Sequence, residues 1–552
     1  MKLACSLAPS TLRIFPNDLP PARAFSPIDA ALNERFSFQL AVRAEADAKV
    51  AVSASASEGW TVRIRRVGLV PMQHHNSDIL ANPLDLAGIG NIPGLVPDPL
   101  FDETSATLAF GETVSFWFTV TPPPDAKPGA YRIAATATPF DRGDAAERIG
   151  RPVTRSAAIR LHPVRIAPRT GFDVTHWFYS DCIIQRYGTR LFDERYWTLL
   201  EAYLKDIAEH GQNVVYVPLF TPPLDTDKLP SQLLNVSRGK GGGHSFDWSD
   251  VRRYVRTARK CGIEKFEWSH FFSQWGCKCA IRIYEGQGET EKLLWPADTP
   301  ATSETYRTFL SKLLPELRKF LADEKILGKS FFHVSDEPHG DEARANYRAA
   351  RAMLRELAPW MKTMDALSQI EFAREGLVDT PVPLTRFALD FLKEGIGSWC
   401  YYCCAPREGY LQHLLDTPLA KVAMHGFLFY RWPFKGFLHW GLNYWNKCQT
   451  RIPVDPFTVA DAGNWGGGWA YGDTFLVYPG PDGPIDSIRW EVFSEAMQDY
   501  ALLQTLGVSR DDPLLAPLQS FSDFPKNARW RIAARRRLLA SRVPAFPRTP
   551  PA

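Results

Sequence analysis

The stretch Phe331-Phe332-His333-Val334-Ser335-Asp336-Glu337-Pro338 carries the signals that decide the fold and the chemistry of this chain. Its apolar start predicts a buried strand. Pro338 ends that strand, because proline has no N–H to donate and restricts the residue before it. Asp336 and Glu337 stand side by side at the strand end, where two carboxylates cannot both ionise cheaply, so one pKa should rise. Such a pair suits general acid catalysis, although a solvated strand end would carry the same residues.

Short apolar strands alternate with amphipathic helices on both sides of this stretch. We expect strands at 174–178, 213–219, 265–270, 331–336, 363–367, 377–382, 399–404 and 436–440. Eight such alternations predict an α/β domain of the TIM barrel type, (β/α)8. If 377–382 were not a strand, 475–478 would take its place, and the barrel would still have eight strands. An open doubly wound sheet is the alternative, but no glycine fingerprint follows the first strand.

Residues 1 to about 165 follow a different pattern. Apolar residues alternate with polar or small ones at 36–42 and 114–120, which is typical of half-buried strands, and proline-rich turns follow. This pattern favours a β-sandwich. The stretch from about 71 to 102 lacks a clear period and is predicted to be a long loop, whose two histidines either reach the next domain or lie on the surface. The predicted domains are 1–165 (β-sandwich), 166–510 ((β/α)8 barrel) and 511–552 (C-terminal helical tail).

Charge and composition argue against several classes of partner. The 552 residues carry a formal net charge of +3, which indicates neither nucleic acid nor a membrane surface. No run of eighteen apolar residues is present to span a bilayer. The Arg-rich tail also has an apolar stripe, so we expect a packed helix there and no nucleic-acid partner. The first nine residues make a poor signal peptide, which predicts a cytoplasmic protein, or a secreted one if a leader was trimmed.

The nine cysteines do not form a regular framework of disulfides. Cys400 and Cys403 are spaced like a metal or redox pair, but on a strand they would point to opposite faces. The sequence contains no other set of metal ligands. We therefore expect no metal ion and no cofactor.

A set of ordered segments resembles glycoside hydrolase family 123 over about residues 30 to 505. The matching segments are 33–40, 272–276, 334–338, 436–440, 472–480 and 491–500. The resemblance implies a β-sandwich followed by a (β/α)8 catalytic domain. It also implies β-N-acetylgalactosaminidase activity on a carbohydrate with a non-reducing N-acetylhexosamine.

The resemblance also implies roles for the paired carboxylates. Glu337 would act as general acid and then as base, while Asp336 would orient the substrate's acetamido N–H and stabilise an oxazolinium-like intermediate. The chemistry agrees, because adjacent residues cannot easily flank both faces of one glycosidic bond, whereas the acetamido oxygen can supply the nucleophile. Candidate sugar-binding residues at strand ends are Trp177, Tyr179, His270, Trp399, Tyr401, Trp440, Asn443, Tyr444 and Asp473.

Each of these candidates has a plainer interpretation as a packing or turn residue. Tyr401 is our choice to hold the acetamido carbonyl, and Asp473 to hold a hydroxyl. Two other functions stay open. One is a glycosidase for a sugar without an acetamido group, using Glu337 with a distant carboxylate such as Asp365 or Asp473. The other is a non-catalytic carbohydrate-binding protein on the same fold.

Overall fold

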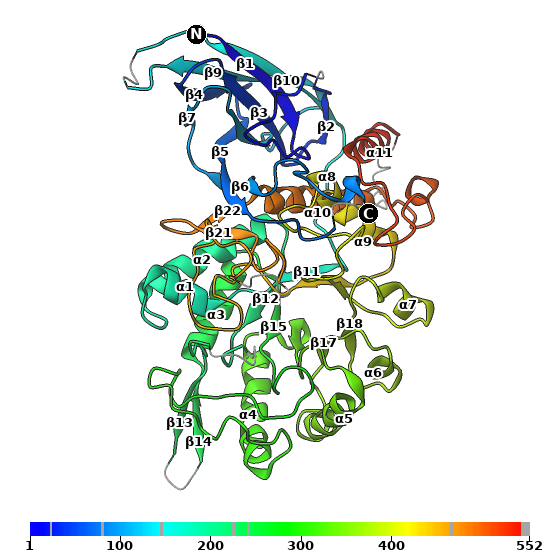
Figure 1. Ribbon diagram of the computed structural model, residues 1–552. Coiled ribbons are helices and arrows are strands. Elements are labelled where there is room, and N and C mark those ends of the chain that lie inside the picture. Colours follow the sequence, from blue (N-terminus) through cyan, green and yellow to red (C-terminus); the bar gives the residue numbers. More distant parts are fainter. Residues whose placement is uncertain are drawn as a thin grey trace, which may run out of the picture.

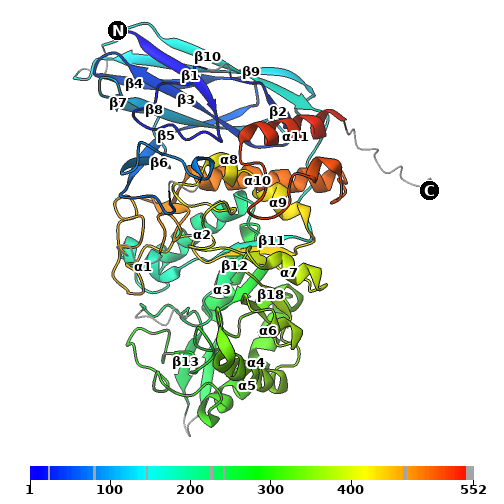
Figure 2. The same cartoon turned by 45° about the vertical axis from the view of Figure 1, so that its right-hand side comes forward.

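The computed structural model describes residues 1–22, 25–78, 82–143, 147–222, 228–239, 243–463 and 469–541. A sheet-rich N-terminal region stands at one end of a larger α/β region (Figure 1). Turning the molecule shows the two regions in contact along one broad face (Figure 2). The chain is therefore built from more than one domain, as its two sequence patterns predict.

Two five-stranded sheets make up the N-terminal region. The first has the order β1-β3-β8-β5-β6 and the second β2-β10-β9-β4-β7. Their strands are β1 (Leu3–Pro9), β2 (Ile28–Ala31), β3 (Phe36–Ala44), β4 (Ala48–Ser55), β5 (Thr61–Met72), β6 (Gly94–Phe101), β7 (Ser105–Leu108), β8 (Thr113–Thr121), β9 (Gly129–Phe140) and β10 (Val153–His162). Phe38 on β3 lies opposite Phe118 on β8, and their rings stack with centroids 4.8 Å apart. The alternation in the sequence thus forms the core between the sheets.

The predicted loop from 71 to 102 was wrong in part, because β6 occupies its last third. Pro97 and Pro99 interrupt the alternation of apolar and polar residues by which a strand is recognised in a sequence, so this strand was not predicted. The structure tolerates them because β6 is the edge strand of its sheet, where a missing N–H leaves no partner unpaired. Earlier in the same stretch, His75 contacts Asp416 of the α/β region with 3.3 Å between Nδ1 and Oδ2. This part of the stretch therefore does reach the neighbouring region.

The α/β region is organised around parallel strands. They form three groups, β11-β20-β19, β12-β15-β16 and β17-β18. Single parallel bridges join Phe332 to Thr363 and Leu384 to Tyr401, which link the groups. The strands of the region are β11 (Asp173–His176), β12 (Val214–Val217), β13 (Asn235–Arg238), β14 (His244–Asp247), β15 (Lys265–Trp268), β16 (Ser330–Phe332), β17 (Met364–Ala366), β18 (Thr380–Val382), β19 (Cys400–Tyr401), β20 (Gly436–His439), β21 (Val477–Pro479) and β22 (Pro484–Asp486).

Eight of these strands correspond to the eight expected from the sequence, each shorter than predicted. The sixth, β18, pairs in parallel with β17, with Met364 opposite Thr380. β13 with β14 and β21 with β22 are antiparallel pairs outside this set. The coarse prediction of a sheet-rich region followed by an α/β region is confirmed.

Helices follow most of the parallel strands and begin where the sequence offers caps. They are α1 (Ser180–Tyr187), α2 (Glu194–Glu209), α3 (Ser249–Lys260), α4 (Glu304–Asp323), α5 (Gly340–Leu357), α6 (Glu371–Arg374), α7 (Ala388–Lys393), α8 (Leu419–Val422), α9 (His425–Arg431), α10 (Ile488–Thr505) and α11 (Ala528–Ser541), with 3-10 turns η1 (Pro83–Asp85), η2 (Leu327–Lys329) and η3 (Pro513–Leu515). The side chain of Asp193 caps α2 and that of Ser303 caps α4. Between β19 and β20 the chain forms two short helices, α8 and α9. Gly426 in α9 lies so close to α10 that an added Cβ would be 1.8 Å from the carbonyl oxygen of Ala496.

Hydrophobic and ionic contacts join the two regions. Buried Trp117 and Val70 of the first sheet belong to the same hydrophobic cluster as the core of the α/β region. Arg65 on β5 is fully buried and pairs with Asp486 and with Glu491 of the α/β region. Because apolar contact and buried charge pairs both cross this face, the regions form a fixed interface.

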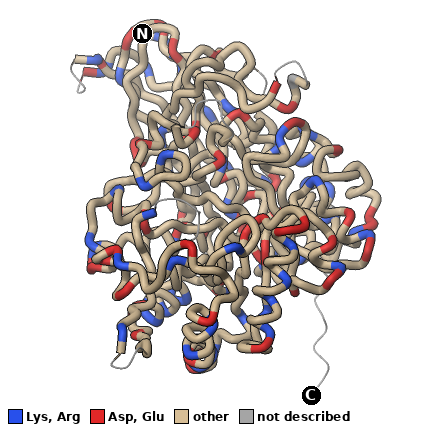
Figure 3. The backbone as a smooth tube through the Cα atoms, turned by 60° about the horizontal axis from the view of Figure 1, so that its bottom comes forward, with Lys and Arg blue, Asp and Glu red and all other residues tan. Residues whose placement is uncertain are grey.

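The basic tail is a packed helix, as predicted, but two of its arginines are buried, Arg531 and Arg535. Arg531 and Arg535 on α11 both pair with the buried carboxylate of Asp499. Arg535 also pairs with Glu34, which follows β2 in the sheet-rich region. In Figure 2, α11 lies against the sheets beside β2. Charge elsewhere is mixed, with Lys and Arg interspersed among Asp and Glu along the chain (Figure 3). The described residues include no helix that is both long and apolar enough to cross a membrane.

Candidate active site

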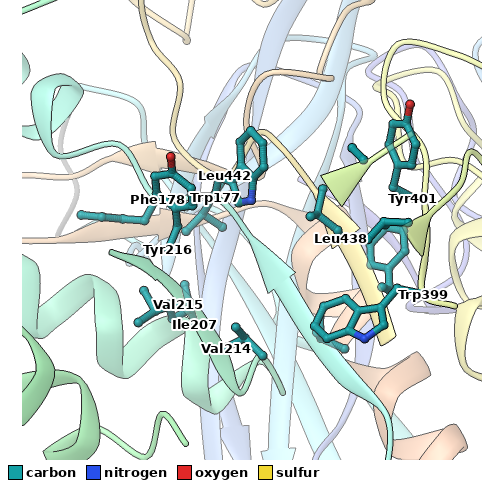
Figure 4. Packing of buried hydrophobic residues seen from close by; sticks show 14 of the residues in the cluster. Trp177, Phe178, Ile207, Val214, Val215, Tyr216, Trp399, Tyr401, Leu438 and Leu442 are labelled. Carbon is teal, nitrogen blue, oxygen red and sulfur yellow. The ribbon is translucent and has the colours of Figure 1, made fainter. Parts of the chain in front are cut away.

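A cavity of about 130 Å³ opens where several parallel strands end. Its walls come from the residues that close or follow β11, β16, β17, β19 and β20, together with three loops. The residues that line it are Trp177, Gln274, Trp275, Asp336, Glu337, Ala366, Tyr401, Cys403, Cys404, Leu438, Trp440, Gln449, Trp469 and Asp473. Figure 4 shows Trp177, Leu438 and Tyr401 projecting from neighbouring strands toward this end of the region. Three carboxylates and several aromatic rings thus share one cavity.

Asp336 is buried and held by one amide. Gln274 donates a hydrogen bond from Nε2 to Oδ2 of Asp336 at 2.8 Å. Burial, followed by the charge of Glu337, raises the pKa of Asp336 from 3.8 to about 8. The hydrogen bond from Gln274 and the charge of His333 oppose this rise without cancelling it. The adjacent carboxylates therefore hold a proton at neutral pH, as two buried like charges should.

Glu337 has a strained backbone and a strong hydrogen bond. Its φ is +43°, in the left-handed region that side chains other than glycine rarely adopt. Its N–H donates to the carbonyl of Ala366 at 3.0 Å, which fixes the turn. The hydroxyl of Tyr401 donates to Oε1 of Glu337 at 2.6 Å. Strain of this kind is retained where it aims a functional group, and here it turns Glu337 into the cavity beside Asp336.

A charged network lies behind Asp336 and Glu337. His333 is fully buried, with Nε2 at 2.6 Å from Glu267 Oε1 and Nδ1 at 3.1 Å from Asp365 Oδ1. Glu267 Oε1 also accepts the indole N–H of Trp177 at 2.6 Å, and Asp365 accepts the Tyr347 hydroxyl and two backbone N–H groups. Both ring nitrogens of His333 face acceptors, so both carry hydrogen.

The electrostatics agree with this donor count. Burial alone would lower the pKa of His333, but the hydrogen bonds to Asp365 and Glu267 and the charges of these groups raise it to about 10. His333 is therefore an imidazolium at neutral pH, three residues before Asp336 on the same segment. It also fixes Trp177 through Glu267, because one carboxylate oxygen receives hydrogen bonds from both rings.

The opposite wall of the cavity is aromatic. Trp440 donates from Nε1 to Oδ2 of Asp473 at 3.0 Å, and the ring centroid of Trp469 lies 5.0 Å from that of Trp440. His439 lies 3.3 Å from the other oxygen of Asp473. Indole rings fixed in this way offer flat apolar faces, while Asp473 offers a buried acceptor.

A model of the glycoside hydrolase 123 catalytic domain matches residues 177–506. The chain belongs to glycoside hydrolase family 123. A comparison with curated proteins finds no match. Among solved structures, a family 123 glycoside hydrolase from Clostridium perfringens, described for glycolipid glycan hydrolysis, aligns over 98% of this chain and 97% of its own, with a TM-score of 0.74 and 14% identity. That likeness shows a shared fold over nearly the whole of both chains.

Two further solved structures are more distant. An FMN-binding β-glucuronidase from Facaelibacterium prausnitzii aligns over 87% of this chain and 60% of its own, with a TM-score of 0.31 and 10% identity. A GH2 β-galacturonidase from Eisenbergiella tayi aligns over 84% of this chain and 69% of its own, with a TM-score of 0.30 and 13% identity. Membership of family 123 makes the chain a glycoside hydrolase, whose substrate is a carbohydrate.

In this family 123 chain, the cavity gathers six of the site residues predicted from the sequence. They are Asp336, Glu337, Trp177, Tyr401, Trp440 and Asp473. The other five lie behind the walls and do not line the cavity. Asn443 binds the backbone N–H and carbonyl of Tyr179, and Tyr444 packs edge-on against Tyr179 with centroids 5.2 Å apart.

His270 and Trp399 are also buried away from the cavity. The ring of His270 stacks on His333 at 4.4 Å and accepts from, or donates to, the hydroxyl of Tyr216 at 3.1 Å. Burial and the charge of His333 lower the pKa of His270 well below its usual value, so it is neutral. Trp399 packs edge-on against Phe331 at 5.2 Å, at the far end of its strand from Tyr401 (Figure 4).

Several lining residues were not selected from the sequence. Gln274, Trp275 and Trp469 come from loops, where no periodicity marks a side chain as functional. Gln274 and Trp275 do lie in the segment 272–276 that carries the family resemblance, which is the signal that could have found them. Cys403 and Cys404 line the same cavity with their sulfur atoms 3.9 Å apart, whereas Cys400 is buried in the core.

Two clusters bring potential metal ligands together. Ligand atoms of His270, His333 and Asp365 lie within 4.8 Å of one another, as do those of Asp206, His210 and Asp486. Both nitrogens of His333 already face carboxylate oxygens, so a metal would have to displace a proton and break a hydrogen bond. The second cluster lies at the interface between the regions and does not line the cavity.

Proposed function

We propose that this glycoside hydrolase is an exo-acting β-N-acetylhexosaminidase that prefers β-N-acetylgalactosaminides and retains configuration through an oxazoline intermediate. The observation that carries the proposal is the side-by-side placement of Asp336 and Glu337 in one cavity. Sequence neighbours on one strand end approach a sugar from the same side. The nucleophile must then come from elsewhere, and the substrate's own acetamido oxygen is placed to supply it. The galacto preference rests on the family resemblance.

The mechanism assigns each carboxyl one task. Glu337 gives a proton to the leaving oxygen while the acetamido oxygen attacks the anomeric carbon and the glycosidic bond breaks. Asp336 accepts a hydrogen bond from the acetamido N–H and stabilises the positive charge that develops on the ring. Water then attacks the anomeric carbon, Glu337 takes its proton, and the oxazoline opens to the product with retained configuration.

The shared proton must move when substrate binds. Before substrate binds, burial favours the proton on Asp336, whose pKa is raised to about 8. An acetamido N–H pointing at Asp336 stabilises its ionised form, so Glu337 becomes the proton carrier. Tyr401 has one hydroxyl hydrogen, and in this structure it donates that hydrogen in a hydrogen bond to Glu337. The expected contact between Tyr401 and the acetamido carbonyl would therefore require that hydrogen bond to break.

The fold supports this proposal in finer detail. We propose that the three groups of parallel strands close into a (β/α)8 barrel, with domains at 1–165, 166–510 and 511–552. Contacts between β11 and β12 and the bridges between the groups support closure. The site would then stand at the carboxyl-terminal face, where barrel enzymes carry their chemistry.

A glycosidase that uses Glu337 with a distant carboxylate is the second candidate. Asp473 lines the cavity and favours it, whereas Asp365 is fully buried and occupied by His333, Tyr347 and the backbone. A non-catalytic carbohydrate-binding protein is disfavoured by the intact pair of carboxylates.

One experiment separates these functions. We would measure kcat/KM for aryl β-N-acetylgalactosaminide, β-N-acetylglucosaminide and β-galactoside, with and without a thiazoline analogue of the intermediate. Substrate assistance predicts much faster cleavage of the acetamido sugars and tight inhibition by thiazoline. Equal rates on acetamido and hydroxyl sugars without inhibition would favour Asp473 as a nucleophile. No cleavage of any panel member would favour a binding protein.

A further inference from the structure

Trp275 places an exposed indole at the mouth of the cavity. The residue is 50% exposed, and none of the other Trp residues in the described ranges falls in the exposed class. It lines the cavity together with Asp336 and Glu337. A single exposed apolar residue is common on a protein surface, but an aromatic ring that lines a cavity beside two carboxylates lies where a bound ligand would cover it.

The loop that carries Trp275 is fixed, so its exposure is not a result of loose packing. The N–H of Trp275 donates to the carbonyl of Asp336 at 2.8 Å, next to the Gln274 bond to the same residue. At Gly276, an added Cβ would lie 2.7 Å from the Cβ of Ala343 on α5, so the loop packs tightly against that helix. The φ of Trp275 is +56°, an unfavourable value for a bulky residue. Backbone strain at a site is retained where it positions a functional group.

The residues that line the cavity differ in solvent exposure, and this difference distinguishes its closed end from its open end. Trp177 and Tyr401 are each 4% exposed and Asp473 is fully buried, so these residues form the closed end. Trp275 stands at the open end. An exo-acting enzyme holds the terminal sugar at the closed end and directs the leaving group to solvent. Trp275 then lies on the leaving-group side of Glu337, which protonates the departing oxygen.

We propose that Trp275 forms a leaving-group subsite, in which its indole stacks on the apolar face of the ring attached to the terminal sugar. The ligand is a flat ring, either the next pyranose of a glycan or an aromatic aglycone, because both offer a face of matching size and polarity. This inference rests on the proposed function, since it takes the terminal sugar and the role of Glu337 from there.

The test compares leaving groups with and without a ring on one terminal sugar. The substrates are a β-linked N-acetylgalactosaminyl disaccharide, the aryl glycoside and the corresponding β-glycosyl fluoride, whose leaving group is a single atom. Trp275→Gly removes the indole, and glycine suits the positive φ, so the loop keeps its shape. We expect kcat/KM to fall about tenfold for the ring-bearing substrates. The fluoride should change less than about twofold, and Trp275→Phe should restore most of the loss.

The controls separate this subsite from the proposed function. Phe110→Ala removes a ring that is 74% exposed on the sheet-rich region and should leave all three rates as in the wild type. Equal losses on the fluoride and the disaccharide in Trp275→Gly would overturn the subsite while leaving the proposed function standing. A lower kcat/KM in Trp275→Gly for the aryl glycoside alone would identify an aromatic aglycone as the occupant. A lower kcat/KM for both the aryl glycoside and the disaccharide would show that the subsite also accepts a pyranose ring. Failure of the wild type to cleave any of the three would overturn the proposed function, and the subsite with it.

Discussion

Replacing Asp336 by Asn should stabilise the folded protein, and the gain should grow with pH. Burial and the charge of Glu337 raise the pKa of Asp336 from 3.8 to about 8. Between these values the folded state keeps a proton that the unfolded chain has lost, so the stability of the wild type falls as the pH rises. At about 1.4 kcal/mol per pKa unit, the penalty reaches about 4 kcal/mol at pH 7. Asparagine has no charge to bury, and its side-chain oxygen can still accept from Gln274.

The measurement is guanidinium unfolding of the wild type and the variant at pH values between about 5 and 7. The difference in unfolding free energy should widen by about 3 kcal/mol across this range, because each pH unit contributes to it. The two carboxyls titrate as a pair, so this free energy belongs to the pair. Asp341→Asn is the matched control, because its side chain is 94% exposed and should show no pH-dependent gain. Parallel stability profiles for the wild type and Asp336→Asn would refute the reasoning.

Four other perturbations test the site and the interface. Glu337→Gln should slow cleavage of substrates with poor leaving groups by roughly two to four orders of magnitude, and an unchanged kcat would remove Glu337 from the role of acid. Tyr401→Phe deletes the hydroxyl bonded to Glu337 and should lower kcat about tenfold with little change in thermal midpoint; a wild-type kcat would show that this hydrogen bond is dispensable. Arg65→Met removes from Asp486 and Glu491 the one fully buried guanidinium that pairs with both and should cost about 3–5 kcal/mol in unfolding free energy, so an unchanged denaturation midpoint would contradict the interface described above. Removing residues 1–165 should give an insoluble fragment, and a soluble, active one would disprove a fixed interface.

Local signals in the sequence were sufficient for most helices and strands of this protein. Helices α2 and α4 could be placed because Asp193 and Ser303 mark their starts and apolar residues follow at helical spacing. Strand β6 was missed because its two prolines break the alternation, and only its edge position makes them acceptable. The approach of α9 to α10 depends on a contact at Gly426 between segments far apart in the chain, which no local pattern encodes.

The site was predictable where one segment carries the chemistry and not where distant segments meet. Asp336 and Glu337 follow an apolar strand, so their position could be inferred. The partners that tune them come from other elements, and Gln274 stands in a loop without a period. Glu267 on β15 and His333 directly after β16 are polar residues in otherwise apolar segments, which indicates a buried polar network. The sequence does not show which of these side chains contact one another.

The last described helix has a consequence for how the protein is made. Arg535 on α11 neutralises Glu34 near the start of the chain, and Arg536 binds Asp29 with 2.9 Å between Nε and Oδ2. Domains emerging from the ribosome generally fold from the N-terminal end. Here the N-terminal sheets would fold with Glu34 still awaiting the guanidinium of Arg535, which lies 501 residues later in the chain. The interface around α11 therefore forms only after this helix has been made, and a chain cut before Ala528 would leave Glu34 and Asp499 without the cations that α11 supplies.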